Sequence, residues 1–110
     1  MPRSYGFTVC VRRNMDAWVD EDHLAINLKH LWGVYKQIGG TALVLYLYLY
    51  SHPNGTILSL SAKTVLRAIG MPESTYRNQV ENLIQAGYLV KNENSGYTYD
   101  FYQMPQKKVQ

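Results

Sequence analysis

The chain opens with a stretch in which apolar and polar residues alternate, over residues 5–13. Its apolar side carries Tyr5, Phe7, Val9 and Val11. Strict alternation over this length is typical of a strand with one buried face. We therefore predict a strand over residues 5–13.

Helical spacing replaces alternation after the acidic residues 20–22. The apolar positions then recur at intervals of four, three, four and three, at Leu24, Leu28, Leu31, Tyr35 and Ile38. This spacing predicts an amphipathic helix over about residues 22–38, with acids at its N-terminus where the helix dipole favours them, and with Gly39 and Gly40 as its end. The seam should be buried, either against its own domain or across a two-fold dimer.

Residues 41–50 (TALVLYLYLY) are compatible with two structures. The Leu/Tyr alternation from Leu45 favours a strand. Thr41 as an N-cap, followed by alanine and leucine, favours a helix. Because the segment is apolar on nearly every side, its pattern indicates burial and leaves the choice open. Residues 51–55 (SHPNG) form a predicted turn.

Two short helices follow, separated by a glycine. The first has Ser61 as its N-cap and ends at Gly70, and the second begins at Pro72 and ends at Gly87. Their apolar positions are Val65, Leu66 and Ile69 in the first helix and Tyr76, Val80, Leu83 and Ile84 in the second. The arrangement predicts a helix-turn-helix over about residues 61–86.

A hairpin is predicted over about residues 88–104. Residues 88–90 favour a strand, residues 92–96 are turn formers, and residues 97–104 alternate as a return strand. Since a lone hairpin is only marginally stable, we expect the strand at 5–13 to complete a three-stranded antiparallel sheet. The last residues, 105–110, should form a flexible tail.

Composition limits the protein to one domain, which we place at residues 1–104. The chain has 110 residues, of which 46% are hydrophobic and 17% charged, enough to bury a core. A net charge of +3 permits a nucleic-acid partner without requiring one. The single cysteine, Cys10, excludes a disulfide framework. With no membrane-length apolar segment and no signal peptide, we expect a cytoplasmic protein without a membrane partner.

Catalytic chemistry finds no support in the sequence. His23, His30 and His52 lack metal-ligand spacing with any acid. A Ser-His-Asp or Cys-His arrangement and a glycine-rich phosphate loop are both missing. We therefore expect no enzymatic activity, no metal or other cofactor, and no small-molecule substrate.

Residues 65–89 (VLRAIGMPESTYRNQVENLIQAGYL) resemble the core of bacterial and phage winged-helix DNA-binding domains. The positions in register are Ile69, Gly70, Met71, Thr75, Tyr76, Arg77, Val80, Leu83, Gly87 and Leu89. The wider layout resembles the N-terminal domain of phage and plasmid replication-initiation proteins. This resemblance implies an α+β winged helix-turn-helix fold. It places a helix at about residues 41–51, within a three-helix core that has an additional N-terminal helix, and a small antiparallel sheet of N-terminal strand and wing hairpin.

The resemblance also implies binding to duplex DNA, in phage or plasmid replication initiation or in transcriptional regulation, within a bacterial or phage-infected cell. The second helix of such a unit lies in the major groove, where arginine pairs with guanine, asparagine with adenine, and serine or threonine with phosphate. The expected DNA contacts are Lys63, Arg67, Ser74, Thr75, Arg77, Asn78 and Lys91.

Each of these assignments has an alternative. Arg77 has acids four residues away on either side, Glu73 and Glu81, and can pair with one of them along its own helix. Both acids also repel phosphate. A protein–protein adaptor without sequence-specific DNA binding is therefore the second functional hypothesis, and a homodimer remains open in either case.

Overall fold

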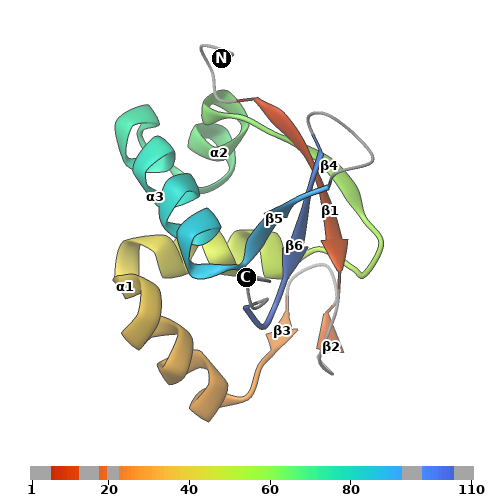
Figure 1. Ribbon diagram of the computed structural model, residues 1–110, viewed down its shortest axis with the longest axis vertical. Helices are drawn as coiled ribbons and strands as arrows, with labels where there is room; N and C mark the ends of the chain where they lie inside the picture. The colour runs from red at the N-terminus through yellow and green to blue at the C-terminus, as the bar shows by residue number, and fades with distance from the viewer. Residues whose placement is uncertain (1–5, 13–17, 20–22, 93–97, 106–110) are drawn as a thin grey trace.

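The computed structural model describes residues 6–12, 18–19, 23–92 and 98–105. Within these residues the chain forms an α+β fold with three helices, a four-stranded mixed sheet and a two-stranded ribbon (Figure 1). The elements are β1 (Phe7–Arg12), β2 (Trp18–Val19), β3 (Leu24–Ala25), α1 (Leu28–Tyr50), β4 (Ile57–Leu60), α2 (Ala62–Ile69), α3 (Glu73–Ala86), β5 (Leu89–Lys91) and β6 (Thr98–Tyr102).

The sheet differs from the predicted antiparallel one. Its strand order is β4-β1-β6-β5, and β1 runs parallel to β6, with Val9 opposite Tyr99. The pairs β1–β4 and β5–β6 are antiparallel. A parallel pair needs a long crossover connection, and here the segment with all three helices connects β1 to β6. The prediction that the N-terminal strand pairs with the hairpin is therefore confirmed, whereas its antiparallel direction and the three-strand count are wrong.

The two helices predicted at 22–38 and 41–51 form one bent helix, α1. Only Gly39 leaves the helical conformation, with φ 82° and ψ 170°, and the helix resumes at the next residue. A φ in this range suits glycine, so the chain turns there without a loop. Figure 1 shows the two halves of α1 at an angle, with the first half directed away from α2. The prediction of an additional separate helix is therefore wrong.

The helix also begins later than predicted. Asn27 is the N-cap, and its side chain accepts a hydrogen bond of 3.0 Å from the amide of His30. Leu24 and Ala25 belong to β3, which pairs with β2. The acidic residues 20–22, where the N-terminus was predicted, lie outside the described residues.

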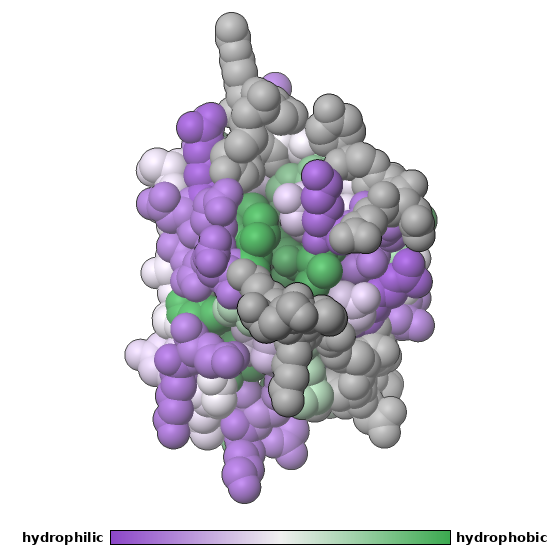
Figure 2. All heavy atoms as spheres, in the orientation of Figure 1, coloured by the Kyte–Doolittle hydropathy of each residue, from purple (hydrophilic) through white to green (hydrophobic). Residues whose placement is uncertain are grey.

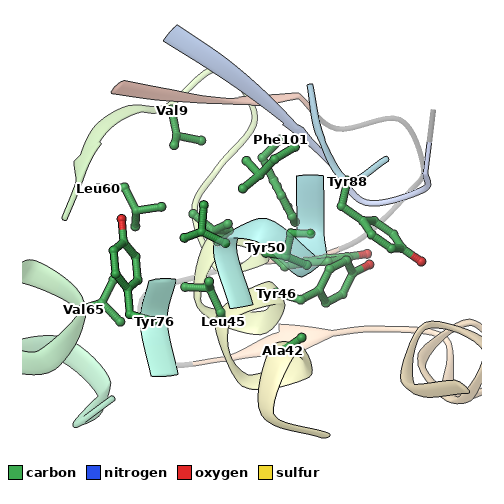
Figure 3. Packing of buried hydrophobic residues seen from close by; sticks show 14 of the residues in the cluster. Val9, Ala42, Leu45, Tyr46, Tyr50, Leu60, Val65, Tyr76, Tyr88 and Phe101 are labelled. Atoms are coloured by element: carbon green, nitrogen blue, oxygen red, sulfur yellow. The ribbon is translucent and has the colours of Figure 1, made fainter. Parts of the chain in front are cut away.

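The core lies between the sheet and the helices. In Figure 3, side chains from the strands, such as Val9 and Phe101, and from the helices, such as Leu45 and Tyr76, form one cluster. Among its fully buried members are Val9, Leu45, Tyr46, Leu49, Tyr50, Leu60, Val65, Tyr76, Val80, Leu83 and Phe101. The Tyr46 ring is central, with edge contacts to Tyr50 at 5.5 Å, Tyr88 at 5.3 Å and Phe101 at 5.5 Å between ring centroids. Such tilted pairs add to the stabilisation gained from burial alone.

The predicted burial of the seam on α1 is largely wrong for a single chain. Ile38 is buried, but Leu28 is 61% exposed and Tyr35 is 52% exposed. The helix instead turns Val34 inward. Periodicity identified an apolar helix and its buried Ile38, but one turn earlier the buried residue is Val34 and not Tyr35. Burial of the seam across a dimer stays a prediction.

Within the described residues, no helix has the length and apolar character needed to cross a membrane. In the same part of the chain, no group of three or more His, Cys, Asp and Glu side chains could hold a metal ion.

Candidate nucleic-acid interface

The two helices α2 and α3 are set by local signals at their ends. The Ser61 hydroxyl accepts a hydrogen bond from the Thr64 amide at 3.2 Å, and the Thr64 hydroxyl accepts one from the Ser61 amide at 3.0 Å. This reciprocal capping box fixes the start of α2. Gly70 ends α2 with φ 72°. The next residue, Met71, is buried, so the turn packs against the core.

One face of α3 is anchored and the other is exposed. Tyr76, Val80 and Leu83 are fully buried, at the i, i+4, i+7 spacing of one helix face. Their burial confirms the prediction that these apolar positions of the second helix form its inner face. The opposite face carries exposed polar side chains, namely Glu73, Ser74, Arg77, Asn78 and Glu81.

The position of α3 is fixed by contacts with its neighbours. The Asn82 side-chain amide donates a hydrogen bond of 2.9 Å to the carbonyl of Ile38 in α1. After α3, the Tyr88 hydroxyl donates to Oε1 of Gln37, also in α1. Gly87 closes α3 with φ 91° and leads the chain directly into β5. Contacts with α1 therefore hold α3 in place on its buried side, while its opposite face stays exposed.

A hollow of about 490 Å³ lies on the exposed face of α3. The described residues that line it are Glu73, Ser74, Arg77 and Asn78. Within it, Nη2 of Arg77 lies 3.2 Å from Oε2 of Glu73, and both side chains are about half exposed. An exposed i,i+4 pair of this kind contributes only about 0.3–0.5 kcal/mol, so a stronger anionic partner can replace Glu73.

Positive charge lies on the elements beside α3. Lys63 and Arg67 are exposed on α2, and Lys91 is exposed at the end of β5. Figure 2 shows hydrophilic side chains over the side of the molecule on which α3 lies. The tip of the β5–β6 hairpin, at residues 93–97, lies outside the described residues.

Of the seven predicted DNA contacts, the structure brings three together in one hollow: Ser74, Arg77 and Asn78. Thr75 is half-buried beside them in the chain, so its hydroxyl is less accessible than predicted. Lys63, Arg67 and Lys91 lie on α2 and β5, outside the residues that line the hollow. The alternative in which Arg77 pairs with Glu73 is the arrangement observed in the free protein. Whether any of the seven contacts DNA stays a prediction.

Comparison with known proteins identifies a helix-turn-helix in the same part of the chain. A family model described as a helix-turn-helix domain matches residues 36–89. The match runs from the first half of α1 to the start of β5, so it includes α2, the turn and α3. The searches of curated proteins and of solved structures give no significant match. The chain therefore contains a helix-turn-helix domain at residues 36–89.

Proposed function

We propose that this protein binds duplex DNA with α3 in the major groove. The observation that carries the proposal is the exposed face of α3, where Arg77 and Asn78 border one hollow on the second helix of a helix-turn-helix. A helix fits the major groove, which is about 12 Å wide. Arg77 can pair with guanine and Asn78 with adenine, while Ser74 in the first turn can bind phosphate.

The neighbouring cations support the same docking. With α3 in the groove, we assign Lys63 and Arg67 of α2 and Lys91 of the wing strand β5 to the phosphate backbone. These contacts would give affinity that depends on salt and little on sequence. Binding requires Arg77 to leave Glu73. Because this exposed pair contributes little to stability, the exchange costs little free energy.

The setting we propose is replication initiation or transcriptional regulation in a phage, a plasmid or their bacterial host. Its support is the resemblance of residues 65–89 to the core of bacterial and phage winged-helix DNA-binding domains, and of the order of elements to the N-terminal domain of replication-initiation proteins. The strand that precedes α1 and the hairpin that follows α3 are consistent with that layout.

The test is selection of bound sequences from a random duplex pool, followed by fluorescence anisotropy with the selected duplex. Arg77→Ala should weaken specific binding by about 1–3 kcal/mol and relax the preference at one base pair. Lys91→Ala should weaken all duplexes alike and reduce the slope of log affinity against log salt by about one.

Arg12→Ala is the matched control. It removes the same charge and likewise breaks one ion pair, since Nε of Arg12 lies 3.4 Å from Oδ1 of Asp100, but Arg12 belongs to β1 and not to α2, α3 or β5. This variant should keep the sequence preference of the wild type. The proposal fails if the wild type shows no salt-dependent binding to any duplex near about 50 mM salt. It also fails if Arg77→Ala and Arg12→Ala behave alike.

A further inference from the structure

The first half of α1 is attached to the body of the protein through one face. Val34 and Ile38 are buried, and Nε2 of His30 lies 2.9 Å from the Tyr46 hydroxyl. Gln37 accepts the hydrogen bond from Tyr88. These four positions, at 30, 34, 37 and 38, fall on one side of a helix with 3.6 residues per turn.

The side that faces away is apolar. Leu28 is 61%, Trp32 54% and Tyr35 52% exposed, and their i, i+4, i+7 spacing makes one continuous row, which we name the outer stripe. Half-buried Leu31 joins this row to the buried face. The other exposed large hydrophobics in the described residues are dispersed over separate elements: Val44, Ile57, Leu66, Val90 and Met104. Single exposed apolar residues are ordinary, whereas a contiguous row of three large ones forms a patch of the kind that is often functional.

Within α1, the charge beside the outer stripe has one sign. Lys29 and Lys36 are both exposed, lie seven residues apart and therefore share one flank of the helix. They are the two charged residues of α1, which has no acidic side chain. The helix N-terminus adds partial positive charge at the Leu28 end. The stripe is thus complementary to a surface that combines apolar and acidic side chains.

A second copy of this chain fits the outer stripe poorly. In an antiparallel two-fold pair, the flank with Lys29 and Lys36 would meet the same flank of the other copy. The total exposed area of the three stripe residues is roughly 350 Å², given about 150–250 Å² for each aromatic side chain, whereas a stable dimer buries about 800 Å² on each partner.

Single-stranded nucleic acid is also a weaker fit. Bases would stack on Trp32 and Tyr35 beside the two lysines. However, Leu28 and Leu31 continue the same row with aliphatic side chains, which offer no stacking face. The row of four apolar residues at helical spacing instead suits the apolar side of another helix.

We propose that the outer stripe, with its lysine flank, is a docking site for an acidic amphipathic helix of a partner protein. From Leu28 to Tyr35 the stripe is about 10 Å long, so two to three turns of the partner suffice. Apolar side chains of the partner would cover Trp32 and Tyr35, and carboxylates would pair with Lys29 and Lys36. The site lies on the first half of α1 and does not use the exposed face of α3, so it is independent of the proposed DNA binding.

The experiment is selection from a displayed library of helical peptides, randomised between apolar and charged residues, followed by anisotropy with the best labelled peptide. Selected peptides should carry leucine or phenylalanine at i, i+3, i+4, i+7 positions and acids on one flank. Trp32→Ala should weaken their binding about tenfold or more. Val44→Ala, a truncation of another exposed apolar residue in the second half of α1, should leave binding unchanged.

Lys36→Glu should reduce the affinity for the selected acidic peptide about tenfold and favour peptides with basic flanks. Urea unfolding and duplex binding of each variant should match the wild type, since the changed side chains are exposed. The proposal is overturned if no peptide prefers the wild type to Trp32→Ala. It is equally overturned if Trp32→Ala abolishes self-association, or abolishes binding of a single-stranded oligothymidine, without affecting any peptide.

Discussion

Replacing Tyr46 with phenylalanine should lower the free energy of unfolding by about 1 kcal/mol at neutral pH. The Tyr46 hydroxyl donates a hydrogen bond of 2.7 Å to the carbonyl of Gln103 and is fully buried. Phenylalanine keeps the ring and its contacts with three neighbouring aromatic rings. What is lost is the bond to Gln103, with a net value of about 0.5–1.5 kcal/mol, and the contact of the hydroxyl with Nε2 of His30 at 2.9 Å. Nε2 of His30, 3.1 Å from the same carbonyl, remains available to donate.

The same substitution should become almost neutral in alkaline solution. Burial, followed by the neighbouring Tyr50 and Tyr88 hydroxyls, raises the pKa of Tyr46 above its ordinary value of 10.0. In the unfolded chain Tyr46 ionises near that value, while in the folded protein it keeps its proton. The folded state then binds more protons, so the contribution of Tyr46 to stability falls as the pH rises. One pH unit above the unfolded pKa, the loss is about 1.4 kcal/mol.

Urea unfolding followed by circular dichroism, at about pH 7 and about pH 11, tests both parts. Tyr88, whose pKa burial also raises, is present in both proteins, so its contribution cancels in the difference. The difference in stability should shrink from about 1 kcal/mol to near zero. A difference that stays constant over this range would refute the reasoning. So would a loss of about 3 kcal/mol at neutral pH, because that magnitude belongs to lost packing.

Gly70→Ala should lower the free energy of unfolding, measured with urea, by about 1–2 kcal/mol. The φ of Gly70 is 72° and an added Cβ would meet no atom within 4 Å, so the cost lies in the backbone conformation alone. Gly33→Ala, also in open space but inside α1, should instead raise the free energy of unfolding by up to about 1 kcal/mol, and equal effects of the two changes would contradict this explanation. Ser61→Ala should cost about 1 kcal/mol through loss of the α2 cap, and an unchanged urea midpoint would show that the cap is dispensable. Glu73→Gln should cost less than about 0.5 kcal/mol in stability yet strengthen duplex binding measured by anisotropy, since it weakens the pair with Arg77 and removes a charge that repels phosphate; weaker binding would count against the proposed docking.

Local signals made α2 and α3 predictable from sequence. Ser61, Gly70 and Gly87 act within a few residues of the helix ends that they define, so no knowledge of distant contacts is needed. The buried face of α3 followed from its spacing for the same reason. With that face fixed, Ser74, Arg77 and Asn78 had to share the opposite one, and the structure places them in one hollow.

Features that depend on distant contacts were not predictable. Alternation at residues 5–13 indicates a strand but carries no information on the direction of its partner, so the parallel pairing with β6 was missed. β4 has only four residues, and its Ile57 is 70% exposed, which leaves no clear alternation to recognise. At Gly39 the sequence indicated a helix end, and the non-helical Gly39 does interrupt α1 there, but the sequence did not show that the helix resumes at the next residue to give one bent helix.

The place of β1 inside the sheet has a consequence for synthesis on the ribosome. β1 is made first, yet one of its two neighbours is β6, the last strand to be made. During translation the helical segments can form early, because their contacts are local, whereas β1 must wait with one edge exposed. An exposed apolar strand in an incomplete chain is prone to associate with other chains. Pausing before Thr98 would prolong this vulnerable stage, and emergence of β6 from the ribosome would end it.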